Sequence, residues 1–334
     1  MNGKRWAAIG IAVFLFGFSV VSSLLFTFRD AESSLAEMFT SASEPFVEEV
    51  IEEGNAMNKI AVLNLNGTIQ DTGEAGSLLG ATGYNHQSFM KKLDFVKEDN
   101  SVEGIILRVN TPGGGVVESA EIHDKIVEIQ EETEKPVYIS MGSMAASGGY
   151  YISAPADKIF ASAETMTGSL GVIMQGYNFS GLAENLGVDF VTIKSGEYKD
   201  IMSSTREMTE EERSILQDMI DNSYDGFVKV ISEGREMTEA EVREIADGRI
   251  YDGRQALELN LIDGFGYLDD VIQQMEDDYD LGGAQVVQYA DNVGFGSLLS
   301  MGVQKFAGPE TEMVGLVNLL SHTHSPRLMY LYAE

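Results

Sequence analysis

The sequence predicts an α/β protein whose mostly parallel β-sheet is flanked by helices. Short runs rich in β-branched residues recur along the chain, among them "KIAVLNLNGTI" from residue 59 and "GIILRVN" from residue 104. Most are followed by a segment with helical period, such as residues 117–134, "VESAEIHDKIVEIQEETE". Strands that alternate with helices favour a parallel sheet, because each helix carries the chain back to the start of the next strand.

The first predicted element is a transmembrane helix. Residues 6–28 are uncharged and strongly apolar, and they are long enough to cross the core of a bilayer. The run is longer than the apolar core of a cleavable signal peptide, and charged residues follow it directly, so we expect an uncleaved anchor. Lys4 and Arg5 before it, and the acidic residues 44–54 after it, place the amino terminus in the cytoplasm and the rest outside. Residues 1–28 are thus expected to be the cytoplasmic terminus and anchor of a single-pass cell-membrane protein.

Changes in pattern set the remaining boundaries. Residues 29–57 are polar and acidic with a sparse apolar period, and they are expected to form a linker or a short amphipathic helix. Residues 58–280 carry the alternating strands and helices and form the main domain. Residues 281–334 hold one strand candidate, "AQVVQYA", and are otherwise expected to be a weakly patterned C-terminal segment with a mobile tail.

Further strands of the main domain are expected at "PVYISMG" (136–142), "KIFASAE" (158–164) and "DFVTIKSG" (189–196). After these strands the chain turns helical. Capping boxes at Thr209 and Thr238 open two helices, and the first runs to about Ser232. Residues 249–266 then indicate a short strand, a short helix and a glycine turn, which precede a helix over residues 268–279.

Composition narrows the chemistry. The 334 residues include no cysteine, which excludes disulfides, a thiol nucleophile and cysteine-ligated zinc. With 44% hydrophobic residues the chain buries the core of one large domain or two modest ones. The 53 acidic and 22 basic residues give a formal net charge of −31. A surface of that sign repels phosphate backbones, so nucleic acid is not an expected partner.

A candidate nucleophile lies in "GSMAASGGYY", residues 142–151. The stretch ends an apolar strand and begins a helix whose first turn starts at Ser147, which puts that hydroxyl at the end of the strand. The amides of a first turn, here including that of Gly148, have no partner within the helix and point outward. The small residues around them allow a substrate backbone to approach closely.

A second loop, "NTPGGG" at residues 110–115, follows another predicted strand. Its glycines bring bare amides to the carboxyl end of a neighbouring strand, where ligands gather in open α/β sheets. Two amide-presenting loops side by side suit the negative oxygen of a tetrahedral intermediate. Each loop alone is more often a packing corner or a phosphate loop, although "NTPGGG" lacks the lysine and hydroxyl of a P-loop.

Histidine is a poor candidate for the general base. The four histidines are His86, His123, His322 and His324, and none lies in the body of the domain that follows Ser147. His86 and His123 precede that serine, and the other two belong to the C-terminal segment of residues 281–334. A Ser-His-Asp triad is therefore poorly supported.

A buried lysine is an alternative base, because desolvation lowers the pKa of an ammonium group toward neutrality. The candidates are Lys158, Lys194, Lys199 and Lys229. Lys158 and Lys229 have ordinary surface settings, whereas Lys194 and Lys199 flank the turn "SGEY" at the end of a predicted strand. Composition leaves the choice between these two open. Since a neutral amine is the active form, activity is expected to rise with pH.

Four motifs together resemble the signal peptide peptidase A family of membrane-anchored serine proteases. They are "NTPGG", "MGSMAASGGYYISAPADKI", "TGSLGVI" and "SGEYKD", and they occur in the family's order. The resemblance covers residues 58–270 and implies the ClpP/crotonase fold. The chain is most similar to the single-copy Gram-positive form, which is about half as long as the tandem-repeat form, and it contains no long internal repeat.

The resemblance implies a role for five residues of this sequence. Ser147 falls on the family's nucleophile and Lys199 on its general base, which settles the choice against Lys194. Ser169 matches the serine that orients the lysine amine. The oxyanion amides fall on Gly114 and Gly148. The family needs neither a metal nor an organic cofactor, so none is expected.

The resemblance also implies assembly and a substrate class. In this family serine and lysine come from adjacent copies of the core, so we expect a homo-oligomer, an octameric dome on the outer membrane face, anchored in the bilayer through residues 6–28. The implied substrates are remnant signal peptides and other apolar peptides, cut after small or aliphatic residues. The tail "LMYLYAE", residues 328–334, resembles such a substrate, and we hypothesise that it reaches the groove of an active site.

Two other classes of function compete with the protease. A crotonase-type acyl-CoA enzyme shares the fold and the paired oxyanion amides, and it predicts thioester chemistry for which Lys199 is dispensable. A non-catalytic membrane scaffold predicts that alanine at Ser147 and at Lys199 leaves function intact.

Overall fold

The computed structural model describes residues 46–71, 84–291 and 327–332. The chain divides into two compact units, and the site discussed below lies within the unit formed by Glu48–Tyr289 and Ala307–Glu334. The predicted anchor at residues 6–28 lies outside the described residues. Within those described ranges no helix is both long and apolar enough to cross a membrane.

The main sheet is mostly parallel. In the described part of the chain its strands are β1 (Phe46–Glu52), β2 (Asn55–Asn66), β3 (Val102–Thr111), β5 (Val137–Ala146), β6 (Lys158–Ala161), β7 (Met166–Gly168), β8 (Ile250–Tyr251), β9 (Gly264–Phe265) and β10 (Ala284–Asp291). Their order is β1-β10-β2-β3-β5-β6-β9, with β7 beside β5 and β8 beside β7. Within this sheet β2 runs parallel to β10 and β3, β5 runs parallel to β3, β6 and β7, and β6 runs parallel to β9, whereas β7 and β8 are antiparallel. A small second sheet pairs β4 (Gly113–Gly115) with β11 (Met329–Leu331).

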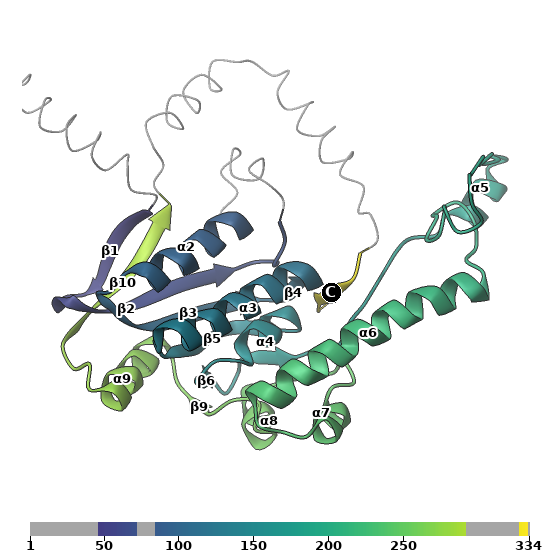
Figure 1. Cartoon of the computed structure of the whole chain (residues 1–334). Coiled ribbons are helices and arrows are strands. Elements are labelled where there is room, and N and C mark those ends of the chain that lie inside the picture. Colours follow the sequence, from purple (N-terminus) through teal and green to yellow (C-terminus); the bar gives the residue numbers. More distant parts are fainter. Residues whose placement is uncertain (1–45, 72–83, 292–326, 333–334) are drawn as a thin grey trace, which may run out of the picture. The chain divides into compact units, whose positions relative to one another are not determined.

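Helices cover both faces of the main sheet (Figure 1). The described helices are α2 (His86–Glu98), α3 (Val116–Thr133), α4 (Gly148–Ser153), α5 (Ser180–Asn185), α6 (Glu210–Gly234), α7 (Glu239–Ile245), α8 (Gly253–Glu258) and α9 (Leu268–Tyr279). Because side chains alternate along a strand, one set of strand residues faces α9, and Ile60, Ile106 and Met275 share that core. α2 packs on the other face of β2 and β3. The predicted α/β class with a mostly parallel, helix-flanked sheet is confirmed.

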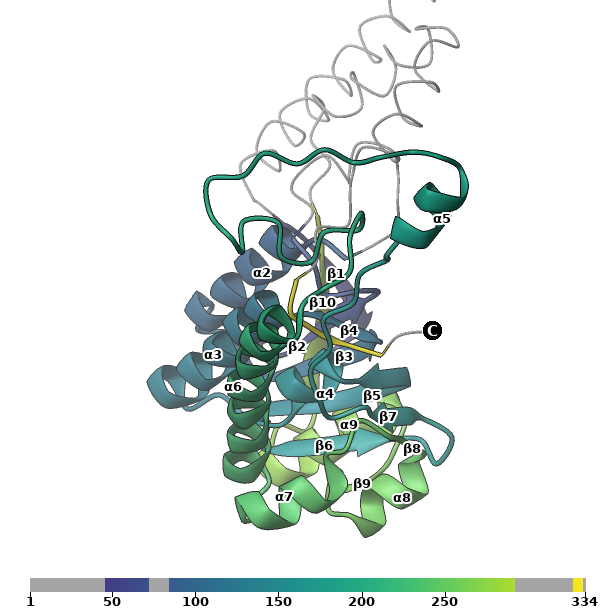
Figure 2. The ribbon, with the colours of Figure 1, turned by 90° about the vertical axis from the view of Figure 1, so that its right-hand side faces the viewer.

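The segment between β7 and α6 leaves the body of the sheet. Residues 174–208, here called the extension, include α5 and run out beyond the amino-terminal end of α6 in both views (Figures 1 and 2). Large apolar side chains stand exposed along it: Tyr177, Phe179, Leu182, Leu186, Val188, Phe190, Val191 and Ile193. Val191 and Ile193 are 88% and 96% exposed. Such a run of apolar surface is unusual for an isolated soluble chain.

Three expectations about local structure are wrong. Residues 46–57 form β1 and the start of β2 rather than part of a linker or amphipathic helix. Residues 189–196 form no strand and lie exposed on the extension, because none of the strands in the described ranges pairs with them. The boundary at residue 280 falls too early, since β10 pairs in parallel with β2 inside the main sheet.

The helical half of the chain follows its sequence signals closely. Thr209 and Thr238 both form complete capping boxes, at the starts of α6 and α7. α9 spans Leu268–Tyr279 as predicted, and "AQVVQYA" forms β10. The tail, defined here as residues 327–334, contains the short strand β11, which the weak pattern of this segment did not predict.

Candidate active site

Ser147 stands at the junction of β5 and α4 in a strained conformation. Its φ of 53° and ψ of −114° lie outside the regions that residues with a Cβ normally occupy. Its N–H donates to the carbonyl oxygen of Gly168 at 2.8 Å, and its own carbonyl accepts from the N–H groups of Tyr150 and Tyr151, each at 2.9 Å. Three backbone hydrogen bonds thus hold a conformation of the kind that costs about 1–3 kcal/mol and clusters at functional sites.

The hydroxyl of Ser147 is buried and unpartnered. The residue is 1% exposed, and its Oγ has no hydrogen-bond partner among the described residues. Leaving a buried hydroxyl unpaired costs about 1–3 kcal/mol, so its retention calls for a reason other than stability. His86 is bonded instead to Tyr84 and Glu121, and the ring of His123 packs near Tyr151. In the described part of the chain, therefore, no histidine acts on Ser147.

The two glycine loops meet beside this serine. Gly113 has a φ of +99°, and a Cβ placed on it would lie 2.6 Å from the amide nitrogen of Gly148. A Cβ on Gly148 would in turn lie 3.1 Å from the amide nitrogen of Gly114 and 2.7 Å from Oγ of Ser119. The amide nitrogens of Gly114 and Gly148 therefore border one small space, as the predicted oxyanion site requires, and only glycine leaves that space open.

The tail of the same chain lies in this space. β11 pairs antiparallel with β4, in a register that sets Tyr330 opposite Gly114. The carbonyl oxygen of Tyr330 would be 3.0 Å from a Cβ on Gly148 and 2.0 Å from one on Gly113. The tail therefore lies along β4, as that hypothesis expects, and the carbonyl of Tyr330 lies where the glycine amides converge.

Backbone hydrogen bonds hold the tail from both sides. Met329 and Ile173 exchange two N–H to carbonyl bonds, each of 3.0 Å, on the side away from β4. The N–H of Tyr332 donates to the carbonyl oxygen of Pro112 at 2.9 Å. An extended peptide thus completes a short sheet between two segments of the domain, which is the β-augmentation mode of peptide recognition.

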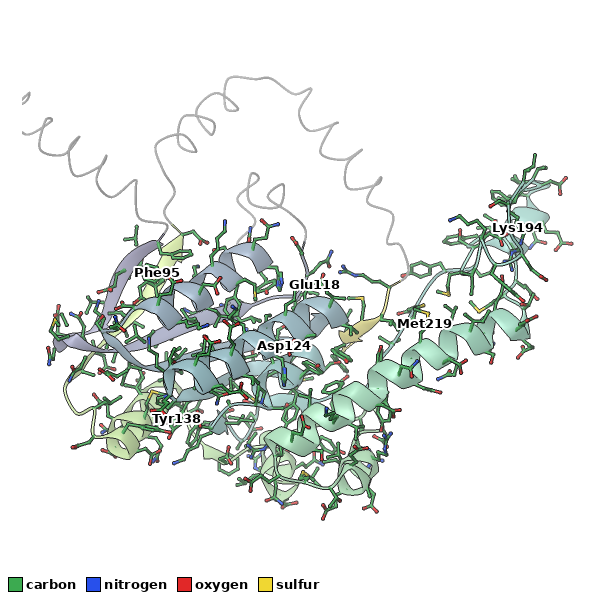
Figure 3. The ribbon with its side chains drawn as sticks, viewed as in Figure 1. Phe95, Glu118, Asp124, Tyr138, Lys194 and Met219 are labelled. Carbon is green, nitrogen blue, oxygen red and sulfur yellow. The ribbon has the colours of Figure 1, made fainter. Side chains whose placement is uncertain are left out.

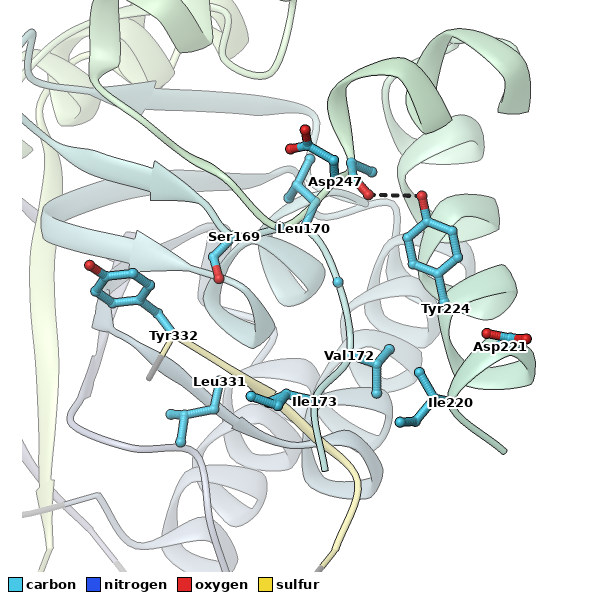
Figure 4. Close-up of a pocket in the computed structure, with 13 residues that line it drawn as sticks. Ser169, Leu170, Val172, Ile173, Ile220, Asp221, Tyr224, Asp247, Leu331 and Tyr332 are labelled. Carbon is cyan, nitrogen blue, oxygen red and sulfur yellow. Dashed lines mark hydrogen bonds between the residues drawn. The ribbon is translucent and has the colours of Figure 1, made fainter. Parts of the chain in front are cut away.

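Ser169 belongs to the same group of residues. β5 and β7 pair so that Ala146 lies opposite Gly168, which brings the residues that follow, Ser147 and Ser169, to the same edge of the sheet. Ser169 also has a positive φ, 51°, and its N–H donates to the carbonyl oxygen of Arg249 at 2.7 Å. Figure 4 shows its side chain at a cavity of about 570 Å³, which is also lined by Leu331 of the tail.

The two candidate lysines are distinguished by their ion pairs. Lys194, labelled on the extension in Figure 3, donates to a carboxylate oxygen of Asp200 at 2.7 Å and to the carbonyl oxygen of Glu197 at 2.6 Å. Arg206 binds the same carboxylate, and these bonds hold the pKa of Asp200 well below its ordinary value. Lys199 is exposed, and within the described ranges its ammonium makes no ion pair or hydrogen bond. Lys194 thus braces the extension and Lys199 is left available.

The described chain brings together four of the five predicted site residues. Ser147, Gly148, Gly114 and Ser169 share one edge of the sheet, whereas Lys199 lies on the extension, which leads away from α4 in both views (Figures 1 and 2). No hydrogen bond among the described residues joins Lys199 to either serine.

An aromatic pocket around the side chain of Tyr330 was not predicted. Tyr330 is 2% exposed and stacks on Tyr151 with ring centroids 4.8 Å apart and planes at 24°. The ring of Phe227 packs against it at 4.6 Å, and the Tyr330 hydroxyl donates to the carbonyl oxygen of Ser223 at 3.0 Å. We call Tyr151, Phe227 and this carbonyl the tyrosine pocket. In the sequence these groups belong to two separate helical segments, where the aromatic residues are indistinguishable from ordinary core residues.

Docking of the tail should weaken at high pH. Burial, and to a smaller extent the nearby Tyr151, raises the pKa of Tyr330 above its ordinary value of 10.0. The docked tail therefore holds the phenolic proton more tightly than the free tail does. Docking should keep its full strength below about pH 10 and weaken as the pH rises through the raised pKa.

A binding titration checks this expectation. A labelled peptide "LMYLYAE" should lose affinity as the pH rises above about 10 for a Ser147→Ala chain that ends at residue 326, as measured by fluorescence polarisation. The same peptide with Tyr330→Phe should bind with little change over that range. Equal pH dependence of both peptides would show that the phenol does not ionise in this step.

Comparisons with known proteins agree with this geometry. The profile of Peptidase family S49 matches residues 129–282. A protein of Enterococcus faecium that carries the name signal peptide peptidase SppA is 41% identical over 344 aligned positions, which cover 99% of each chain. Protease 4 of Haemophilus influenzae is 32% identical over 84% of this chain and 48% of its own length.

A viral relative extends the similarity. The capsid assembly protease C of Escherichia phage lambda is 30% identical over 67% of this chain and 50% of its own length. The matched profile includes Ser147, Ser169 and Lys199. The chain therefore belongs to peptidase family S49, as one of its signal peptide peptidase A serine proteases.

Proposed function

We propose that the chain is a membrane-anchored serine endopeptidase in which Ser147 attacks the substrate and Lys199 of a second copy serves as general base. The observation that carries the proposal is the peptide strand β11, whose Tyr330 carbonyl oxygen lies against Gly113 and Gly148 beside the unpartnered Ser147 hydroxyl. A bound peptide in that position supports hydrolysis of a peptide bond over chemistry on an acyl-CoA thioester.

The proposed reaction proceeds through an acyl-enzyme. The Lys199 amine accepts the Ser147 proton while Oγ bonds to the carbonyl carbon of the substrate, and the oxyanion lies between the amides of Gly148 and Gly114. Collapse of this intermediate breaks the carbon–nitrogen bond, and the lysine returns the proton to the leaving amine. Water then attacks the ester, again with the lysine accepting a proton, which releases the acid and regenerates serine. Ser169 orients the amine.

A second copy is needed because Lys199 lies outside the group around Ser147. The exposed apolar side chains of the extension, including Val191 and Ile193, support an oligomer in which this segment packs on a neighbour. The cavity beside Ser169 has room for an incoming lysine side chain. We propose a closed ring, with eight copies as the resemblance to the family implies.

The membrane location and substrates follow from the same proposal. Residues 6–28 anchor the chain, and the protease domain lies at the outer membrane face. Substrates are remnant signal peptides and other apolar peptides, whose backbones add a strand between β4 and Ile173 as the tail does.

Complementation between two inactive variants tests the shared dyad. Full-length Ser147→Ala and Lys199→Ala chains should each cleave a fluorogenic apolar peptide at least about a thousandfold more slowly than the parent chain. Assemblies formed from an equal mixture should regain about one quarter of the parental activity, because half of the sites keep the serine and half of their neighbours keep the lysine.

The matched control for Lys199 is Lys194→Ala, which removes an ammonium group from the same turn but one that is already bonded to Asp200. This variant should retain most of its activity, since exposed ion pairs contribute little to stability. If the mixed assemblies stay inactive while both variants still assemble, the dyad is not shared between copies.

A further inference from the structure

The hydroxyl of Ser119 is buried and has no hydrogen-bond partner. Ser119 is the fourth residue of α3 and is 0% exposed, and its Oγ bonds to no atom of the described residues. Three buried side-chain oxygen atoms in the described ranges share this property, and the other two are those of Ser147 and Tyr289. An unpaired buried hydroxyl lowers stability, so its retention in α3 calls for a function.

The Ser119 hydroxyl also makes no bond to its own helix. Serine and threonine hydroxyls within helices commonly donate to the carbonyl oxygen four residues earlier. Thr133 in the same helix and Ser153 in α4 do so, at 2.7 and 2.6 Å. For Ser119 that carbonyl belongs to Gly115, and no such bond forms in the described chain. The hydroxyl hydrogen is therefore available to an acceptor outside the helix.

The oxyanion space lies within reach of this hydroxyl. A Cβ placed on Gly148 would lie 2.7 Å from Oγ of Ser119 and 3.1 Å from the amide nitrogen of Gly114. The same Cβ would lie 3.0 Å from the carbonyl oxygen of Tyr330. The Ser119 hydroxyl, the Gly114 amide and the tail carbonyl thus surround one point beside Gly148. The Ser119 hydroxyl still makes no hydrogen bond to this carbonyl, which is planar in the docked tail.

We rest this inference on the proposed function, in which the Tyr330 carbonyl stands in for the carbonyl that Ser147 attacks. During the attack the carbonyl carbon becomes tetrahedral, and its oxygen moves and takes up negative charge. We propose that the Ser119 hydroxyl donates a hydrogen bond to this oxyanion, as a third donor beside the amides of Gly114 and Gly148. Because the hydroxyl has no partner to give up, the new bond stabilises the transition state and not the bound substrate.

Cleavage kinetics of two full-length variants test this role. Ser119→Ala removes the donor, and Ser119→Cys fills the same space with a thiol, which is a weak donor. Each variant should lower kcat for a fluorogenic apolar peptide about tenfold to hundredfold and leave KM unchanged, because the lost bond forms only in the transition state. Parental kcat in both variants would overturn the inference and leave the protease intact.

Ser153→Ala is the matched control, because it removes a buried hydroxyl that is bonded within its own helix. This variant should lose stability in urea unfolding and keep its kcat, whereas Ser119→Ala should unfold at no lower urea concentration than the parent. The pH dependence of kcat should keep its midpoint in Ser119→Ala, since a donor to the oxyanion leaves the lysine amine as it was. A shifted midpoint would show that Ser119 acts through the lysine and would overturn direct donation.

A transition-state mimic separates this inference from the proposed activity. The probe is a labelled peptide of the tail sequence "RLMY", residues 327–330, whose last residue carries a boronic acid in place of its carboxyl group. Oγ of Ser147 bonds to the boron, the hydroxyl proton passes to water, and the adduct is a tetrahedral anion. The same peptide with a terminal amide measures binding of the ground state.

Both probes are titrated into the full-length parent and Ser119→Ala chains and followed by fluorescence polarisation. The tail competes equally with the two probes, so the ratio of their affinities is independent of it. Ser119→Ala should lower the boronate-to-amide ratio about tenfold to hundredfold. If the parent cleaves no peptide but the ratio falls in this way, the proposed activity fails and the third donor stands. An unchanged ratio overturns the inference whatever the activity.

Discussion

Replacement of Ser147 by alanine should lower kcat by about four to six orders of magnitude and leave the fold at least as stable as before. The hydroxyl is the only part of the side chain that alanine lacks, and in the described structure it is buried without a partner. Its removal relieves the cost of an unpaired buried polar group, and alanine meets the same backbone strain at φ 53° that serine does. Activity and stability are therefore expected to change in opposite directions.

The matched control is Ser153→Ala, at the last residue of α4, the helix that begins directly after Ser147. Ser153 is as buried as Ser147, but its Oγ donates to the carbonyl oxygen of Gly149 at 2.6 Å. This variant should lose about 1 kcal/mol of unfolding free energy and keep its activity. Steady-state cleavage and urea unfolding of the two variants measure both effects. Loss of stability in Ser147→Ala, or retained cleavage, would remove the argument that this serine is kept for chemistry.

A methyl group on Gly148 should reduce kcat/KM by about a hundredfold to a thousandfold. In Gly148→Ala the new Cβ would lie 3.1 Å from the amide nitrogen of Gly114 and 3.0 Å from the carbonyl oxygen of Tyr330. It would also lie 2.7 Å from Oγ of Ser119, a short side chain that is able to turn aside. The chain should therefore still fold, while the space for the oxyanion is filled.

Gly226→Ala provides the control for adding a methyl group to a helical glycine. Gly226 lies within α6, and a Cβ there meets no atom within 4 Å. The substitution should raise stability by about 0.5–1 kcal/mol and leave kcat/KM unchanged. Assays of the two alanine variants with one peptide compare them directly. If Gly148→Ala cleaves as fast as Gly226→Ala, the amide of Gly148 does not stabilise the transition state.

Local signals in the sequence predicted most of the regular structure. Capping boxes at Thr209 and Thr238 mark helix starts because the reciprocal bonds involve only neighbouring residues. The buried parallel strands read as apolar runs because both of their faces are covered. The wrong predictions concern segments whose structure depends on whether another strand pairs with them. Residues 46–52 form an edge strand although their spacing suggests a helix. Residues 189–196 have the composition of a strand but pair with none of the strands that the structure describes.

In the candidate site, too, the features that depend on local geometry were predictable and those that depend on tertiary contacts were not. Ser147 and the two glycine loops were predictable, because strand ends and helix starts place their amides by local geometry. The residue pattern alone left Lys194 and Lys199 open, and only the resemblance to the family chose Lys199. The ion pair between Lys194 and Asp200, which the sequence does not reveal, agrees with that choice. The tyrosine pocket joins α4, α6 and the tail, so its parts are separated by long stretches of chain and share no local pattern.

The strand β11 is covalently part of the domain whose groove it occupies, and this determines how peptides compete for the site. A tethered ligand has an effective concentration fixed by its linker, so dilution of the protein does not release it. The concentration of an incoming peptide must exceed this effective concentration, multiplied by the ratio of the peptide's dissociation constant to that of the tail, before the peptide occupies half of the grooves. The tail should therefore raise the apparent KM for every peptide and leave kcat unchanged, so that scarce apolar peptides are cleaved slowly and abundant ones rapidly.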